Sequence, residues 1–165
     1  MSATENGLVT VRVTVNGRAY ERAVEPRKAL SDFIREDLGL TGTHVACEHG
    51  FCGVCNILLD GQTVRSCLMF AVQADGHAIE TVESLASPDG TLSALQQAFN
   101  DNAGLQCGYC TPGMLMTAKE HLDRHPDGGT DDEIREAIAG VVCRCTGYQQ
   151  IIESIRAAAT PGKGA

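Results

Sequence analysis

Cysteine is the residue type in this sequence best suited to chemistry, and its positions are grouped. The chain of 165 residues carries eight cysteines in two groups of four. The first group is Cys47, Cys52, Cys55 and Cys67, and the second is Cys107, Cys110, Cys143 and Cys145. Thiolates at short spacing bind metals or take part in redox exchange, whereas isolated core cysteines have no reason to gather. The pattern predicts two thiolate-rich sites.

The first group has the spacing C-x4-C-x2-C-x11-C, within "CEHGFCGVC" and "RSC". This is the ligand spacing of a plant-type [2Fe-2S] cluster, with three thiolates from one loop and the fourth from a following strand. Gly50 and Gly53 suit such a loop, since glycine adopts positive φ and lets backbone amides approach sulfur closely. We therefore expect a [2Fe-2S] cluster at this group.

Two other metal centres compete for the first group. A structural zinc site also uses four thiolates and C-x2-C. A Rieske centre would use the C-x-H of Cys47 and His49, but the second half of its motif, C-x2-H, is absent from the sequence. The zinc site therefore remains the alternative, and we expect His44 and His49 to be solvated or to lie outside the ligand set.

The second group comes from two short segments, "QCGYC" and "CRC". If two helices run out and back between them, both segments and the helix N-termini that follow meet at one end of a bundle, which favours thiolates. Thiols one residue apart, as in Cys143 and Cys145, can both face a metal, whereas a disulfide between them would be strained. Arg144 either offsets the charge of the centre or forms an ordinary surface ion pair.

Composition fits metal-assisted folding. Hydrophobic residues make up 43% of the chain, but aromatic residues make up only 4% and tryptophan is absent. A thin core gains from metal binding, whose free energy becomes folding free energy. The N-terminus resembles neither a secretory signal nor a membrane span, so we expect a cytoplasmic protein without direct membrane insertion, in which disulfides are disfavoured. A net charge of -8 with scattered basic residues argues against nucleic-acid binding.

The first half of the chain predicts a small α+β domain. Alternating apolar residues and Asn16-Gly17 predict a hairpin, and Asp60-Gly61 predicts another. The expected elements are a hairpin over 8–15 and 18–24, a helix over 28–40, a hairpin over 56–69 and a strand over 77–82.

The second half has helical periodicity. The turn-rich segment 84–93 suggests a boundary, which divides the chain into domains 1–83 and 84–165. We expect a helical bundle with helices over 91–101, 111–125, 130–139 and 148–159, and a disordered end, "TPGKGA".

The segments "TGTHVACEHGFCGVC", "LQCGYCTPGM" and "CRCTGYQQI" resemble the iron-sulfur subunit of the molybdenum hydroxylase, or xanthine oxidase, family. The resemblance extends over about residues 8–159 and includes all eight cysteines. It implies an α+β protein with an N-terminal plant-ferredoxin-like (β-grasp) domain and an all-α four-helix-bundle domain, each holding one [2Fe-2S] cluster.

The same resemblance implies a role in electron transfer. Electrons would pass from a large molybdopterin-binding subunit through the helical-domain cluster and the ferredoxin-like cluster to a medium FAD-binding subunit or an external acceptor, within a dimer of heterotrimers. Gln106 and the backbone at Cys145 would contact the pterin. The chain has no catalytic residues of its own in this scheme, and the sequence does not indicate the substrate of the complex.

Four positions, in three segments, depart from the usual family pattern. Family members usually have glycine where Ala46 stands, threonine where Asn56 stands, and "GNLCRC" where this chain has "GVVCRC". Every cysteine is retained, so these changes concern packing and redox potential. Two alternatives remain at the level of sequence: a stand-alone ferredoxin-type carrier and a zinc-stabilised interaction module.

Overall fold

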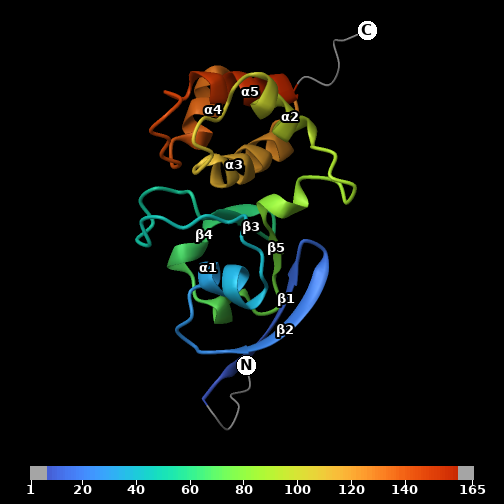
Figure 1. Ribbon diagram of the computed structural model, residues 1–165, viewed down its shortest axis with the longest axis vertical. Helices are drawn as coiled ribbons and strands as arrows, with labels where there is room; N and C mark the ends of the chain where they lie inside the picture. Colours follow the sequence, from blue (N-terminus) through green and yellow to red (C-terminus); the bar gives the residue numbers. More distant parts are fainter. Residues whose placement is uncertain (1–6, 160–165) are drawn as a thin grey trace.

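The protein, described here over residues 7–159 of a computed structural model, consists of a sheet-based part followed by a helical part (Figure 1). The described strands form one sheet in the order β2-β1-β5-β3-β4. Their bounds are β1 (Val9–Val15), β2 (Arg18–Val24), β3 (Asn56–Leu59), β4 (Gln62–Arg65) and β5 (Ala78–Glu80). The β1–β5 pairing is parallel and the others are antiparallel. The expected mixture of helix and sheet is confirmed.

Both hairpins turn where the sequence predicts. Asn16 and Gly17 have φ of 51° and 77°, and Asp60 and Gly61 have φ of 49° and 78°, as tight two-residue hairpin turns require. The second hairpin is shorter than the expected 56–69, because β4 ends at Arg65 and a 3₁₀ turn, η2 (Ser66–Leu68), follows. The Ser66 hydroxyl donates to the Cys55 carbonyl at 2.8 Å, which turns the chain back toward the first cysteine loop.

The expected helix over 28–40 is also shorter and changes form. It runs as α1 (Leu30–Asp32) and continues as a π-helical turn, η1 (Phe33–Asp37). Two further 3₁₀ turns, η3 (Ala71–Ala74) and η4 (Val82–Ser84), flank β5, which is shorter than the expected strand over 77–82. The core between helix and sheet consists of Val11, Val13, Val15, Val24, Leu30, Phe33, Ile34, Ile57, Ala71, Ala74 and Ile79.

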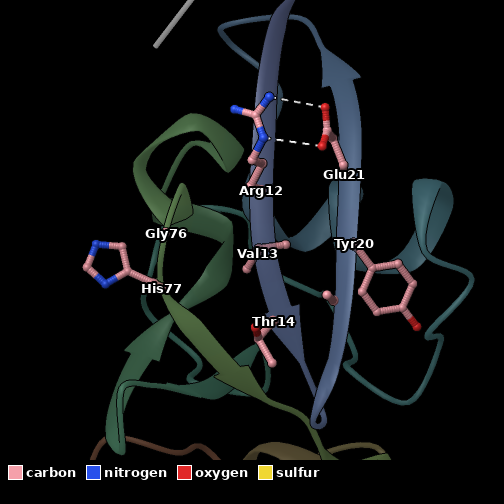
Figure 2. A pocket seen from close by; sticks show the side chains of 8 residues that line it. Arg12, Val13, Thr14, Tyr20, Glu21, Gly76 and His77 are labelled. Atoms are coloured by element: carbon pink, nitrogen blue, oxygen red, sulfur yellow. Dashed lines mark hydrogen bonds and ion pairs between the residues drawn. The ribbon is translucent and has the colours of Figure 1, made fainter.

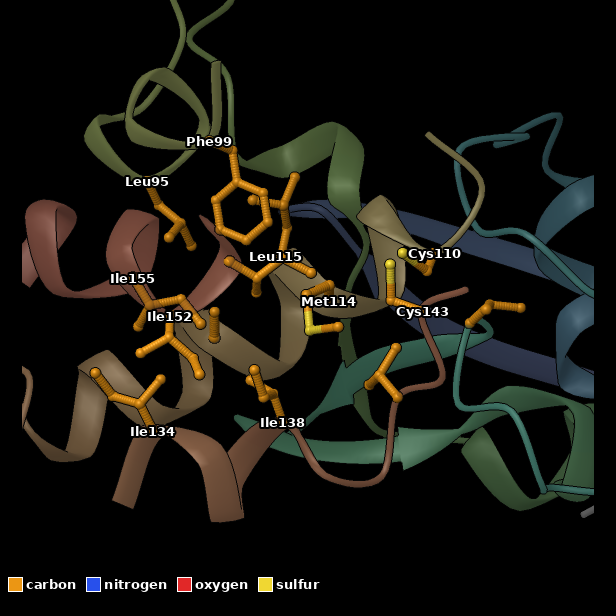
Figure 3. Close-up of a cluster of buried hydrophobic side chains, with 14 residues drawn as sticks. Leu95, Phe99, Cys110, Met114, Leu115, Ile134, Ile138, Cys143, Ile152 and Ile155 are labelled. Atoms are coloured by element: carbon orange, nitrogen blue, oxygen red, sulfur yellow. The ribbon is translucent and has the colours of Figure 1, made fainter. Parts of the chain in front are cut away.

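The helical part contains α2 (Ala94–Asp101), α3 (Thr111–Arg124), α4 (Asp131–Ile138) and α5 (Gln149–Ala159). Capping boxes begin two of them: Ser93 and Gln96 cap α2, and Thr130 and Glu133 cap α4. The Ser93 cap explains why α2 starts later than the expected residue 91. Isoleucines of α4 and α5 pack with Leu95, Phe99 and Met114 in the second core (Figure 3).

The expected disorder of "TPGKGA" lies outside the described residues. Within residues 7–159, no helix has the length and apolar character needed to cross a bilayer.

Backbone atoms of the sheet-based part and of the helical part lie in close contact. Helix α3 packs on β3, and Val54 belongs to the helical core. A Cβ added to Gly53 would lie 2.2 Å from the Gly140 carbonyl oxygen, and one added to Gly113 would lie 2.6 Å from the Gly53 carbonyl oxygen. Only glycine allows the two parts to approach this closely.

We expect Gly53→Ala to destabilise the protein more than Gly61→Ala. Both glycines have positive φ, 70° and 78°, so both variants lose about 1 kcal/mol to backbone strain. Gly61 has open space around it, whereas Gly53 faces Gly140, so overpacking adds about 1–3 kcal/mol at Gly53 alone. Denaturant unfolding of equally iron-loaded proteins measures the difference. Equal losses of unfolding free energy would show that the contact has no energetic role.

Candidate metal centres

The first cysteine loop directs backbone amides at a thiol. The Cys52 N–H donates to Cys47 Sγ at 3.4 Å. Hydrogen bonds from the backbone of Cys52, and also from His49 and Phe51, lower the pKa of Cys47 to about 6. The loop can curl in this way because Gly50 and Gly53 have φ of 79° and 70°, the positive values that the sequence predicts. The amides stabilise a thiolate, the form that binds metal.

The other two cysteines of the first set lie together beside this loop. Burial, and then a hydrogen bond with Cys55, raise the pKa of Cys67 to about 11. The charge of Cys47 acts on Cys67 in the same direction, so thiols from the loop and from η2 share one site. Cys55 is buried, and the other three are partly exposed.

The second set converges from two loops, as the sequence predicts. Cys107 and Cys145, both exposed, lie close enough to shift each other's pKa, and so do Cys110 and Cys143, both buried. The sulfurs of the buried pair lie side by side at the edge of the helical core (Figure 3). Helix α3 begins directly after Cys110 and α5 begins shortly after Cys145, so both loops lie at one end of the bundle.

Within each pair of the second set, one thiol is favoured as thiolate. The Tyr109 backbone N–H, and then Cys145, lower the pKa of Cys107, while the hydrogen bond with Cys107 raises that of Cys145. Burial, and then Cys143, raise the pKa of Cys110 to about 12. Burial acts to raise the pKa of Cys143 too, but hydrogen bonds from Thr146 outweigh it and lower the pKa. A bound metal cation would stabilise both thiolates of each pair.

The arrangement of thiols fits a two-iron centre. Each set resolves into two thiol pairs: Cys47 with Cys52, Cys55 with Cys67, Cys107 with Cys145, and Cys110 with Cys143. A structural zinc site needs four ligands around one ion, whereas a [2Fe-2S] cluster has two irons that share four thiolates. Two pairs of neighbouring thiols in each set therefore suit two irons that each take two thiolates.

The structure places the remaining predicted site residues as follows. His44 is half-buried, and its Nδ1 donates to the Tyr109 carbonyl at 2.8 Å. His49 is exposed and hydrogen-bonds to the Cys47 carbonyl. Arg144 is exposed and has no ion pair within the described chain. Gln106 is also exposed, and its side-chain amide has no hydrogen bond to any described residue.

Two tyrosines that the sequence did not single out hold the cysteine loops. The Tyr109 hydroxyl donates to the Val45 carbonyl at 2.6 Å, which ties the second cysteine segment to the start of the first loop. Tyr148 has a φ of 71°, rare for a bulky residue, and its hydroxyl accepts from the Cys143 N–H at 2.8 Å. Their only sequence signal is their position within the quoted motifs "QCGYC" and "CRCTGY".

A pocket elsewhere on the molecule has no cysteine among its lining residues. It lies beside the first hairpin (Figure 2) and is lined by Arg12, Val13, Thr14, Ala19, Tyr20, Glu21, Gly76 and His77. Arg12 and Glu21 pair with each other there at 3.2 Å. The cysteine loops are therefore the candidate site.

Comparison with known proteins yields two matching families. Residues 13–87 match the 2Fe-2S iron-sulfur cluster binding domain, and residues 81–156 match the [2Fe-2S] binding domain.

Related proteins match over most of their length. Caffeine dehydrogenase subunit gamma of Pseudomonas sp. (strain CBB1) is 60% identical over 148 residues, which cover 88% of each chain. The nicotine 6-hydroxylase small subunit of Paenarthrobacter nicotinovorans is 52% identical, over 89% of this chain and 87% of the relative. In the crystal structure of quinoline 2-oxidoreductase from Pseudomonas putida 86, one chain matches with a TM-score of 0.89 and 49% identity, over 93% of this chain and 94% of that one.

The mixed fold, the two [2Fe-2S] domain matches and these relatives agree with the family resemblance of the cysteine motifs. The chain belongs to the small iron-sulfur subunits of the molybdenum hydroxylase family and serves electron transfer within an oxidoreductase complex.

Proposed function

We propose that this chain holds two [2Fe-2S] clusters, one in each cysteine set, and that all eight cysteines are ligands. The observation that carries the proposal is the pairwise convergence of thiols in both sets. In each cluster one thiol pair would bind one iron and the second pair the other iron. Bound clusters of this kind take up and release one electron at a time.

The fold supports a division of the chain around these sites. We propose a plant-ferredoxin-like β-grasp domain over 1–83 and a four-helix domain over 84–165, each folded around its own cluster. The separate cores of the sheet-based and helical parts support this division, as do the family matches, which change over within 81–87. Because thiol ligands must stay reduced, we place the protein in the cytoplasm.

The exposed thiol pair of the helical part suits a large molybdopterin-binding subunit. Cys107 and Cys145 are exposed, and Gln106 beside them presents an amide without an internal partner. Large apolar side chains are also exposed on these loops, namely Leu105 at 39%, Tyr109 at 47% and Val142 at 40%. An interface combines such apolar area with directed polar groups, so we propose that the partner covers this face and that Gln106 and the Cys145 backbone contact its pterin.

A second apolar face surrounds the first cysteine set. Phe51, Leu68 and Phe70 are exposed at 71%, 59% and 50%, and Leu68 directly follows Cys67. We propose that a medium FAD-binding subunit covers this face and receives the electrons, and that the whole assembly is a dimer of heterotrimers. The relatives are named for caffeine, nicotine and quinoline, which are all nitrogen heterocycles. N-heterocycles are therefore the first substrate class to test.

We expect Cys47→Ser and Cys107→Ser each to lose about half of the bound iron. Each variant removes one ligand from a different cluster, so the other cluster stays reducible while electron flow between the partner subunits stops. Iron and sulfide analysis, together with electron paramagnetic resonance (EPR) of the dithionite-reduced complex, measures the loss. Circular dichroism identifies variants that remain folded.

The two variants control for each other, because their missing EPR signals must differ. Loss of the same signal in both, or full iron content in a folded variant, would contradict two separate clusters. Zinc in place of iron in the native protein would instead favour the zinc-stabilised interaction module.

We expect Gln106→Ala to weaken coupling to the molybdopterin subunit while both clusters remain. An amide both donates and accepts, so its loss leaves polar groups of the partner unpaired and costs about 1–3 kcal/mol of interface stabilisation. Gln97→Ala is the matched control, because Gln97 is an exposed glutamine of α2 whose amide pairs with Asp101. The measurements are the affinity of the subunits and the rate of cluster reduction by substrate. A lost cluster with normal docking would assign Gln106 to loop stabilisation.

A further inference from the structure

Arg65, the last residue of β4, joins the two cysteine loops through one guanidinium group. Its Nε donates to the Gly50 carbonyl at 2.5 Å, and its Nη2 donates to the Gly140 carbonyl at 2.8 Å. Gly50 lies within the first cysteine loop, and Gly140 lies shortly before Cys143 of the second set. The planar fork of arginine can hold several carbonyls in fixed positions at once, which a lysine ammonium on its flexible stem cannot do.

Asn56 fixes the direction of this guanidinium. Its Oδ1 accepts from Arg65 Nη1 at 3.1 Å, and its Nδ2 donates to the Thr117 hydroxyl of α3 at 2.8 Å. The Asn56 side chain is almost fully buried, at 3% exposure, so these bonds are shielded from water. Thr117 in turn donates to the Gly113 carbonyl at 2.8 Å. Arg65 and Asn56 therefore form one polar connection between the sheet and helix α3.

The positive charge of Arg65 has no anionic partner in the described part of the chain. Its acceptors there are the three carbonyl oxygens of Gly50, Asn56 and Gly140, and no carboxylate pairs with it. A half-buried cation without a counter-ion is costly unless negative charge lies nearby. Four thiolates around each cluster supply negative charge on both sides of this group.

A backbone hydrogen bond beside Arg65 links the two ligand loops directly. The Val142 N–H donates to the Cys52 carbonyl at 2.8 Å, and Val142 directly precedes Cys143. The Arg65–Gly140 bond restrains the same loop two residues earlier. If Arg65 released Gly140, the loop could move and the Cys52–Val142 bond would lengthen.

We propose that Arg65 is a positioning residue for electron transfer between the two clusters. Together with Asn56 it keeps the Cys52–Val142 hydrogen bond formed, and its unpaired charge favours the reduced state of the nearby centres. The step itself moves one electron from the second cysteine set to the first, so one centre is oxidised, the other is reduced, and no co-reactant is needed. The inference rests on the proposed two-cluster function.

The test compares Arg65→Gln, Arg65→Lys and the control Arg12→Gln in the assembled complex. Arg12 lies on the first hairpin and pairs with Glu21 (Figure 2), so its variant removes the same charge away from the cysteine loops. EPR-monitored redox titration gives the midpoint potential of each cluster, and low-temperature EPR of the fully reduced complex gives the magnetic splitting between them.

Arg65→Gln should lower the midpoint potentials and weaken the splitting, because it removes both the positive charge and the hydrogen bonds to the Gly50 and Gly140 carbonyls. Arg65→Lys should keep the potentials close to those of the unmodified protein but still weaken the splitting. Arg12→Gln should change neither. If both Arg65 variants match Arg12→Gln in potentials and splitting, the proposal is wrong.

A milder variant covers the case in which Arg65→Gln loses a cluster. Asn56→Thr keeps the charge and installs the usual family residue, but its shorter side chain cannot span Arg65 and Thr117. It should reproduce the Arg65→Lys pattern, and unchanged splitting would overturn the positioning role. Iron for only one cluster in the unmodified complex would instead refute the proposed function itself.

Discussion

The close backbone contact between the two cysteine loops is the constraint on which the rest of this structure depends. Gly53 lies against the Gly140 carbonyl, and the Val142 N–H reaches the Cys52 carbonyl at 2.8 Å. Neither contact allows a side chain between the loops. The sheet must therefore bring β3 against α3, and the helical bundle must present its cysteine end toward the sheet. Polar and backbone contacts, together with Val54 in the helical core, hold the two parts in this relation.

Local signals in the sequence predicted most of the fold. Asn16-Gly17 and Asp60-Gly61 fixed the hairpins, since their positive φ values need no distant partner. The predicted ends of elements were wrong where contacts with residues distant in the sequence determine them. Strand β4 ends at Arg65 because the Ser66 hydroxyl donates to the Cys55 carbonyl. The π-helical turn at Phe33–Asp37 was likewise not expected, since a helical pattern of apolar residues does not distinguish α from π geometry over one turn.

The sequence predicted the cysteines of the candidate site from their type and spacing. It did not predict the residues that hold the cysteine loops in place. The cysteine spacing is a local pattern, so both sets could be identified from the sequence. The roles of Tyr109, Tyr148 and Arg65 depend on hydrogen-bond partners distant in the sequence or in the loop geometry, and Arg65 reaches Gly140 in the helical part. The departure at Asn56, which the sequence linked to packing and redox potential, has a specific structural basis, because its amide bridges Arg65 and Thr117.

The hydrogen bond from Val142 to Cys52 also bears on how the protein is made. The first cysteine loop is complete early in synthesis, yet its final partner lies near the C-terminal end of the chain. Contacts between such distant segments form late and slowly, because a long loop must close first. Until Val142 has been synthesised, the first cysteine loop lacks this hydrogen bond. The final conformation of the first cysteine loop therefore depends on a segment that is synthesised much later than the loop itself.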